Sequence, residues 1–145
     1  MSEKNSNVGL VYAEDCNYWK TSRSSPDQWV EKSTKLIREF GGEVLSTGFG
    51  SDEVFGQAAY MIRFSLISGE TFRIVWPVLP TNDDEFAARR QAATMMYHDI
   101  KSKCVSAQVL GPRVAFLPWY EMPDGRPTFQ LADEDLLKGI PQAML

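Results

Sequence analysis

The sequence has few of the residues that build metal centres, disulfide frameworks or catalytic sites. Its 145 residues include two cysteines, Cys16 and Cys104, and one histidine, His98. Two cysteines are too few for a disulfide scaffold, so we expect reduced thiols in a cytoplasmic protein. A lone histidine cannot supply a zinc ligand set, and nothing in the linear sequence argues for a Ser or Cys nucleophile paired with it. We therefore predict a non-enzymatic protein with no metal and no cofactor.

Long apolar runs and phosphate-binding loops are missing as well. No apolar run approaches the roughly 20 residues of a membrane helix, so we expect no membrane partner. The first residues are polar and acidic, and we expect no export signal there. Gly48, Gly50 and Gly56 match neither a Walker loop nor GxGxxG. The 43% hydrophobic content is that of an ordinary folded domain.

Two segments have the spacing of amphipathic helices. Ser25 precedes Pro26 and can form a capping box with Gln28, and the pair Gly41-Gly42 ends this first helix. The second helix runs to about Leu110.

For the second helix, Asn82 and Glu85 are expected to form the capping box. Phe86 is expected in its buried stripe, and Arg90 and Thr94 on its exposed side.

Three segments between these helices alternate with the period of β-strands: residues 43–49, 58–67 and 71–79. An odd-numbered turn at 67–69 would pair Phe64 with Phe72 and place Arg63 and Arg73 together on the opposite face.

The predicted fold is therefore α+β, a three-stranded antiparallel sheet flanked by two helices in αβββα order, with both helices on the aromatic face. Residues 1–24 form an extended N-terminal arm, either loose or docked, and residues 25–145 a single domain. An aromatic segment at 114–120 follows the second helix, and a short terminal helix is expected at 133–138.

Charge is concentrated in the second helix. Residues 86–113 contain five basic side chains and a single acid, Asp99, although the whole chain has a net charge of −4. A basic helix of this kind indicates a nucleic-acid contact, or simply a solvated helix face. The candidate phosphate-binding residues are Arg63, Arg73, Arg89, Arg90, Lys101 and Lys103.

Two further groups have alternative interpretations. The first group, Phe116, Trp119 and Tyr120, is a candidate partner-binding surface if its rings are exposed. Exposed aromatic rings can also stack on the bases of a nucleic acid. The acidic run Asp83-Asp84-Glu85 has the composition of a helix start, and it can also supply oxygen ligands to a divalent cation in a nuclease.

The segments STKLIREFGGEVLSTGFG, AYMIRFSLISGETFRIVWPVLP and AFLPWYEMPDGRPTF resemble a group of small, uncharacterised proteins of phages and mobile elements, which have a closing turn similar to LPDGR. The resemblance covers about residues 29–130. It implies αβββα order and a place near replication and recombination genes. The element order is also similar to double-stranded-RNA-binding domains and to phage single-strand annealing proteins.

These observations predict a non-enzymatic nucleic-acid-binding accessory protein of phage or mobile-element type, with single strands favoured as the partner. The alternative is a protein–protein interaction module or self-assembling adaptor, a homo-oligomer that makes no nucleic-acid contact.

Overall fold

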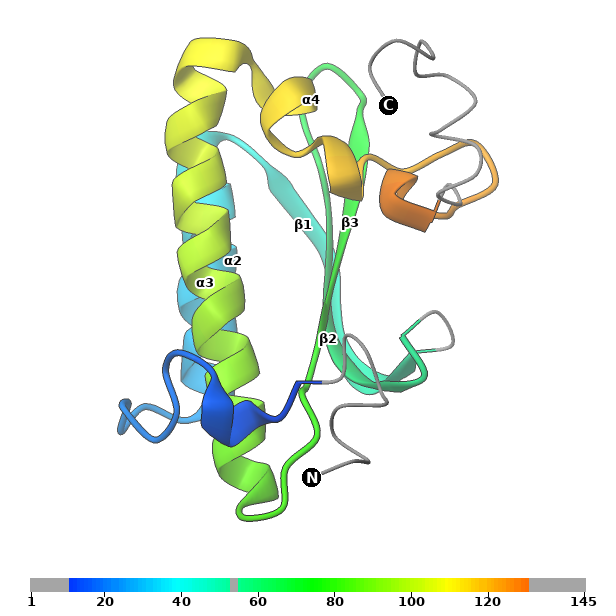
Figure 1. Ribbon diagram of the computed structural model, residues 1–145. Helices are drawn as coiled ribbons and strands as arrows, with labels where there is room; N and C mark the ends of the chain where they lie inside the picture. Colours follow the sequence, from blue (N-terminus) through cyan, green and yellow to red (C-terminus); the bar gives the residue numbers. More distant parts are fainter. Residues whose placement is uncertain (1–10, 53–54, 131–145) are drawn as a thin grey trace, which may run out of the picture.

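The computed structural model describes residues 11–52 and 55–130 (Figure 1). The main elements follow the predicted order, so the α+β class and the αβββα arrangement are confirmed. They are α2 (Pro26–Phe40), β1 (Glu43–Asp52), β2 (Gln57–Ser65), β3 (Thr71–Pro77) and α3 (Glu85–Leu110). The short helix α4 (Pro112–Ala115) and the 3-10 helices η1 (Ala13–Asp15), η2 (Leu117–Trp119) and η3 (Thr128–Gln130) complete the fold.

The three strands form one antiparallel sheet in the order β1-β2-β3. Phe64 pairs with Phe72, as predicted. The Leu66 amide donates to the Glu70 carbonyl at 2.9 Å, which leaves a three-residue turn whose last residue, Gly69, has φ of +91°. Glycine adopts this left-handed conformation without steric cost, so the turn has the predicted length and chemistry.

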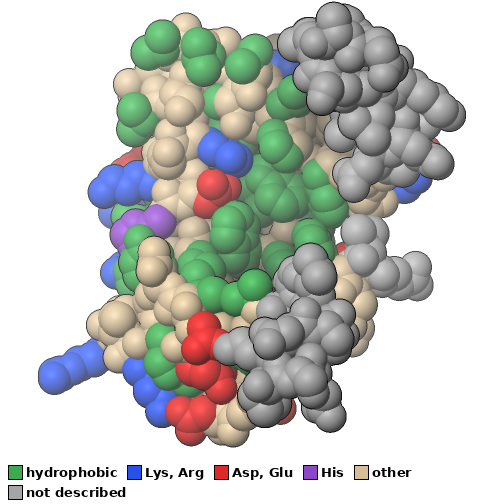
Figure 2. Space-filling view, viewed as in Figure 1, with side chains coloured by type: hydrophobic (Ala, Val, Ile, Leu, Met, Phe, Trp, Pro, Cys, Tyr) green, Lys and Arg blue, Asp and Glu red, His purple; other side chains and the backbone are tan. Residues whose placement is uncertain are grey.

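Helices α2 and α3 cover one face of this sheet (Figure 1). The apolar row of β2 and β3 faces them and is buried with Ile37 of α2 and Met96 of α3. Each fully buried side chain of this size contributes about 1.5–3 kcal/mol to folding. The predicted core face is therefore confirmed, and Figure 2 shows further hydrophobic side chains between α3 and the sheet.

The start of α2 is the predicted capping box. Ser25 Oγ accepts from the Gln28 amide at 3.2 Å, and Gln28 Oε1 accepts from the Ser25 amide at 2.7 Å. The helix ends at Gly41, whose φ of +106° places it in the left-handed cap conformation.

The start of α3 differs from the prediction. Asp84, not Asn82, is the N-cap, and its carboxylate accepts from the Ala87 amide at 3.1 Å. The reason is contact with the N-terminal arm. The Asn82 amide donates to Glu14 Oε2 at 3.1 Å, and Lys20 Nζ lies 2.8 Å from Asp83 Oδ2. These contacts hold residues 82 and 83 outside the helix.

Residues 11–24 of the arm are docked against α3, which is the second of the two predicted possibilities. Ala13 is buried, and Gln91 Nε2 donates to the carbonyl oxygens of Ala13 and Asn17 at 2.7 and 2.9 Å. Thr94, predicted to be exposed, is buried, whereas Phe86, predicted to be buried, is exposed. The arm thus covers a helix face that periodicity alone assigns to solvent.

Some predictions lie outside the described residues, namely the first ten residues of the arm and the terminal helix at 133–138. Within residues 11–52 and 55–130, no helix combines the length and the hydropathy needed to cross a membrane.

Candidate functional site

Arg63 and Arg73 lie side by side on the sheet face that points away from the helices, bound to one acid. Arg63 donates from Nε and Nη2 to the two carboxylate oxygens of Glu121, both at 2.8 Å, and Arg73 Nε lies 3.3 Å from Glu121 Oε2. The Glu121 side chain is 10% exposed. The Arg63 guanidinium, followed by the Arg73 charge, holds the pKa of Glu121 below its usual value.

These two arginines do not extend a basic track from α3. Strand alternation sends Arg63 and Arg73 to the outer face of the sheet, whereas α3 packs on the inner face. The sheet separates the two groups. The six candidate phosphate-binding residues therefore do not form one continuous surface, and Glu121, which was not predicted, partly neutralises the outer pair.

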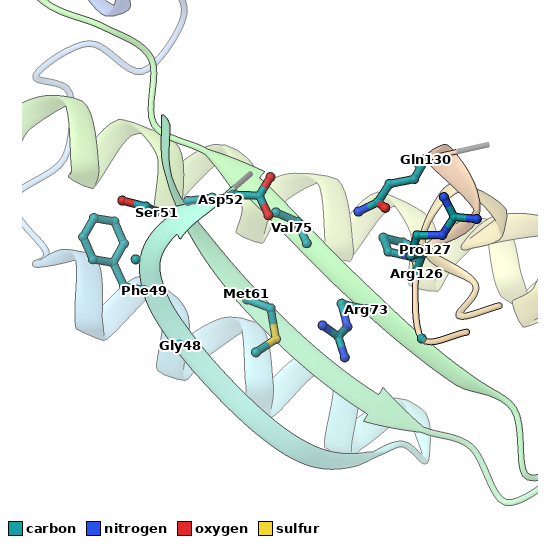
Figure 3. A pocket seen from close by; sticks show the side chains of 13 residues that line it. Gly48, Phe49, Ser51, Asp52, Met61, Arg73, Val75, Arg126, Pro127 and Gln130 are labelled. Carbon is teal, nitrogen blue, oxygen red and sulfur yellow. The ribbon is translucent and has the colours of Figure 1, made fainter. Parts of the chain in front are cut away.

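A hollow of about 310 Å³ lies beside this pair (Figure 3). Its floor includes Gly48 and Gly50 of β1, which have no side chains, and Met61 of β2. Arg73 and Arg126 stand on its walls. Arg126 Nε also lies 2.7 Å from Asp124 Oδ2, so the hollow carries little net positive charge.

Arg89 lies with aromatic rings at the first half of α3. Its guanidinium carbon is 4.5 Å from the ring centre of Phe49 and 6.0 Å from that of Phe86. Both rings are close to half exposed, at 43% and 47%. Arg89 Nε also lies 3.4 Å from Tyr60 Oη, and burial raises the pKa of Tyr60. A guanidinium between accessible rings is able to contact a phosphate while the rings stack on bases.

The other basic residues of α3 have separate surroundings. Arg90 Nη1 donates to the Ser22 carbonyl at 3.1 Å, and its guanidinium carbon is 5.1 Å from the Phe86 ring centre. Lys101 is exposed. Lys103 Nζ is 3.4 Å from Asp99 Oδ1, one turn earlier in the helix. Of the six predicted phosphate contacts, the structure brings only Arg89 and Arg90 together beside accessible aromatic rings.

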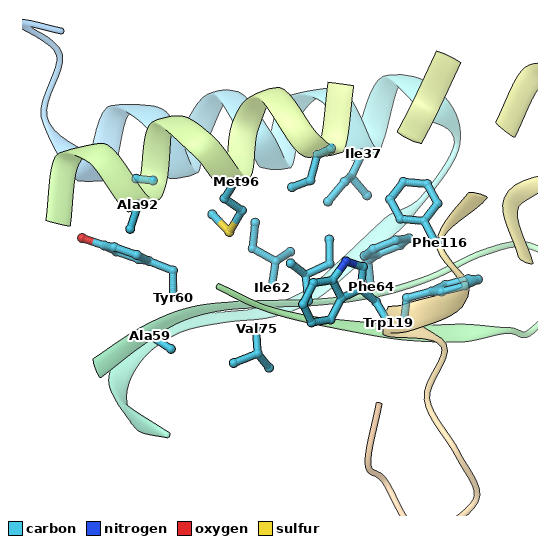
Figure 4. Close-up of a cluster of buried hydrophobic side chains, with 14 of the residues drawn as sticks. Ile37, Ala59, Tyr60, Ile62, Phe64, Val75, Ala92, Met96, Phe116 and Trp119 are labelled. Atoms are coloured by element: carbon cyan, nitrogen blue, oxygen red, sulfur yellow. The ribbon is translucent and has the colours of Figure 1, made fainter. Parts of the chain in front are cut away.

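The predicted aromatic surface is part of the core. Phe116 is buried, packed 5.5 Å from Phe64 and 5.8 Å from Phe72 between ring centres, and Trp119 is only 8% exposed (Figure 4). Tyr120 pairs with Phe72 at the edge of β3 and is partly buried. The interpretation of these residues as an exposed partner-binding surface is wrong, because the chain turns back after α4 and packs them against the edge of β3 and the core.

A different apolar surface is exposed at the C-terminal end of α3. Its members are large aliphatic side chains with exposed fractions of 48–84%, and hydrophobic side chains gather over this end of α3 in Figure 2. We call this surface the apolar end; it consists of Val105, Val109, Leu110, Val114 and Leu117. Periodicity contains a signal for it, because Val105 and Val109 are one turn apart and lie off the buried stripe.

The acidic run at the start of α3 has contacts suited to a helix start. Asp84 caps the helix and Asp83 pairs with Lys20. In the part of the chain that the structure describes, no three His, Cys, Asp or Glu side chains come close enough to hold a metal ion.

The fold defines the class of this protein, a three-stranded antiparallel sheet with its two long helices on one face and a C-terminal segment closing the core. Comparisons with protein-family models, with curated proteins and with solved structures each found no match to this chain. The resemblance to small phage proteins remains a prediction.

Proposed function

We propose that the protein is a non-enzymatic protein-interaction module that self-associates through the apolar end. The observation that carries the proposal is the exposure of five aliphatic side chains at one end of the molecule. Large apolar side chains exposed together at one end of a protein mark contact sites, because monomeric proteins rarely expose large apolar patches.

The composition of this end is that of an interface. Val105 and Val109 form an i, i+4 row on α3, and such rows pack into the grooves of a second helix. Beside the row, Arg113 Nε lies 2.6 Å from Glu70 Oε2, so an ion pair borders the aliphatic centre. An apolar centre with a polar rim is typical of protein interfaces.

A second copy of the chain can cover the apolar end, because a twofold contact needs only the same apolar row on both partners. The proposal places the protein in the cytoplasm, where Cys16 and Cys104 remain reduced.

The test is sedimentation velocity over a range of protein concentrations. We expect the full chain to form dimers, and Val109→Asp to shift it to monomer, because a charge would be buried in the contact. Phe86→Asp is the matched control, since it makes the same change at an exposed site at the other end of α3. A chain that stays monomeric at every concentration would contradict the proposal.

A second candidate function is binding of single-stranded nucleic acid, and the surroundings of Arg89 favour it. Two arginines next to two accessible phenylalanine rings supply phosphate contacts and stacking platforms without any sequence-reading group. In this proposal the protein is an accessory factor of phage or mobile-element type.

Fluorescence anisotropy with labelled single- and double-stranded oligonucleotides at low salt tests this second function. We expect single strands to bind more tightly, and Arg89→Ala and Phe49→Ala each to weaken binding by about tenfold. Val109→Asp is the control that should leave the affinity unchanged. No binding at tens of micromolar protein would reject the function.

A further inference from the structure

Strand β1 leaves one edge of the sheet open. The sheet order is β1-β2-β3, and no segment of residues 11–52 and 55–130 pairs with the other edge of β1. By contrast, the C-terminal segment covers part of the β3 edge, where Tyr120 pairs with Phe72. Most residues of β1 are exposed. An open strand edge presents unpaired N–H and C=O groups, which can accept a further strand.

The sequence of β1 lacks the residues that usually protect such an edge. From Glu43 to Asp52 it contains no lysine, no arginine and no proline. The pairing of β1 with β2 is irregular between Val44 and Ser46, and it is regular from Ser46 to Asp52. Strands of globular proteins are commonly no longer than this regular stretch, which is therefore long enough to pair with a further strand.

Two glycines of this stretch open the outer face of β1 to the hollow beside Arg73. Gly48 and Gly50 lie on the same face of the strand, and both border the hollow, as Met61 of β2 does (Figure 3). The fold does not require glycine at either position, because neither has a positive φ. A Cβ on Gly50 would meet nothing within 4 Å, and one on Gly48 would lie 3.8 Å from Met61 Cε, an ordinary contact. Glycine inside a strand lowers stability, and it often marks a place where another backbone or a ligand approaches closely.

The geometry points to β1 as the docking site for an extended peptide of a partner protein, which adds a fourth strand and places one aromatic side chain across the glycines into the hollow. Neighbouring strands lie about 4.8 Å apart, so a ring on the added strand can reach across a strand that has no side chain there. Recognition by strand addition combines backbone hydrogen bonds with a pocket for a side chain. This surface is independent of the apolar end, whose residues lie on other elements.

The charged and sulfur-containing groups near the hollow define the chemistry of the peptide. Arg73 and Arg126 stand on the walls, and guanidinium groups pack well on the faces of aromatic rings. The thioether of Met61 also makes favourable contacts with such rings. The acids at the two ends of β1, Glu43 and Asp52, favour basic side chains at the ends of the peptide.

A second copy of β1 fits this edge less well than such a peptide. Antiparallel pairing centred on Phe49 would set Gly48 opposite Gly50 and leave the hollow empty. Pairing over the whole strand would set Glu43 opposite Asp52, and like charges directly opposite each other are destabilising. Neither arrangement uses both the open edge and the hollow.

The experiment titrates the full chain with the acetylated and amidated peptide Lys-Thr-Val-Phe-Val-Thr-Lys, followed by NMR. We expect the peptide to slow hydrogen exchange at alternate amides of β1, because successive N–H groups of a strand point to opposite edges. Replacing the phenylalanine of the peptide with alanine should weaken binding about tenfold, since a partly buried ring is lost.

N-methylated peptides distinguish strand addition from nonspecific apolar binding. One peptide is methylated at the amides of both valines, and the other at the amides of the phenylalanine and the second threonine. Only one of these two sets of N–H groups faces β1 in an added strand. We therefore expect one methylated peptide to lose binding and the other to keep most of it.

Two variants of the protein test the hollow. Gly50→Val should fill its mouth and remove the preference for the phenylalanine peptide over the alanine peptide, and the fold should be kept because a Cβ has free space there. Ser46→Val is the matched control, since it adds bulk on the same face of β1 outside the hollow, and it should leave the preference unchanged. Thermal unfolding of both variants confirms that the fold is kept.

The proposal is overturned if the peptide does not bind at millimolar concentration, if the phenylalanine and alanine peptides bind equally, or if Gly50→Val keeps the preference. Equal effects of the two methylation patterns would also overturn it. Alternate amides of β1 that are protected without the peptide would show that the edge is already paired, and protection that grows with protein concentration would assign it to a second copy; either result rejects the proposal.

Discussion

Glu121 is the residue on which the outer face of the sheet depends. One carboxylate receives hydrogen bonds from two arginines of neighbouring strands, which keeps two like charges together that would otherwise repel each other. This contact also fastens the C-terminal segment to β2 and β3.

Replacing Glu121 should reduce stability in a pH-dependent way. The pKa of Glu121 is lowered in the folded protein. The carboxylate therefore makes its full contribution to the free energy of unfolding above the ordinary pKa of glutamate, about 4.3, and this contribution is lost as the pH falls through the pKa of the folded state. Glu121→Gln should therefore be less stable than the native chain at pH 7, and the difference should narrow below about pH 4.

Urea unfolding at a series of pH values measures this difference. Asp124→Asn is the control, because Asp124 also pairs with an arginine of the C-terminal segment but in an exposed position, where ion pairs contribute little. A difference in the free energy of unfolding between Glu121→Gln and the native chain that stays the same at every pH would contradict the prediction.

At the scale of elements, α2 depends on its first turn. Both hydrogen bonds of the capping box are present, and they satisfy backbone amides that the helix itself leaves without partners. The helix packs against α3 and the sheet through Ile37. A change in its first turn therefore affects the stability of the core.

Ser25→Ala should lower the free energy of unfolding by about 1 kcal/mol, since it removes the acceptor for the Gln28 amide. Denaturant unfolding followed by circular dichroism measures the change. Ser24→Ala is the neighbouring control, and we expect it to be close to neutral. Equal losses for the two variants would exclude a capping role for Ser25.

For the molecule as a whole, the C-terminal segment completes the core. Phe116 packs against rings from both β2 and β3, and Trp119 and Tyr120 follow it along the edge of β3. Residues 111–130, the part after α3 that the structure describes, thus belong structurally to the domain.

Phe116→Ala should destabilise the protein by about 3–5 kcal/mol, because it opens a cavity among buried aromatic rings. Leu117→Ala, the next residue and nearly half exposed, should change stability by less than about 0.5 kcal/mol. Thermal or urea unfolding compares them. Similar small effects for both would mean that the segment does not contribute to the core.

Local patterns in the sequence were enough to predict the elements and their order. The period-two rows of β2 and β3, the turn glycine Gly69 and the Ser25 cap act over a few residues, so neighbouring side chains decide them. For the same reason the sequence predicted that Arg63 and Arg73 share one face of the sheet.

Only the tertiary structure decided which distant segments contact each face of the sheet and of α3. Glu121 reaches Arg63 from 58 residues away, and the arm reaches Gln91 from more than 70. Contacts over such separations depend on where the chain returns, which periodicity does not record. That return buried Phe116 and Trp119, brought Glu121 to Arg63 and Arg73, and left the apolar end exposed.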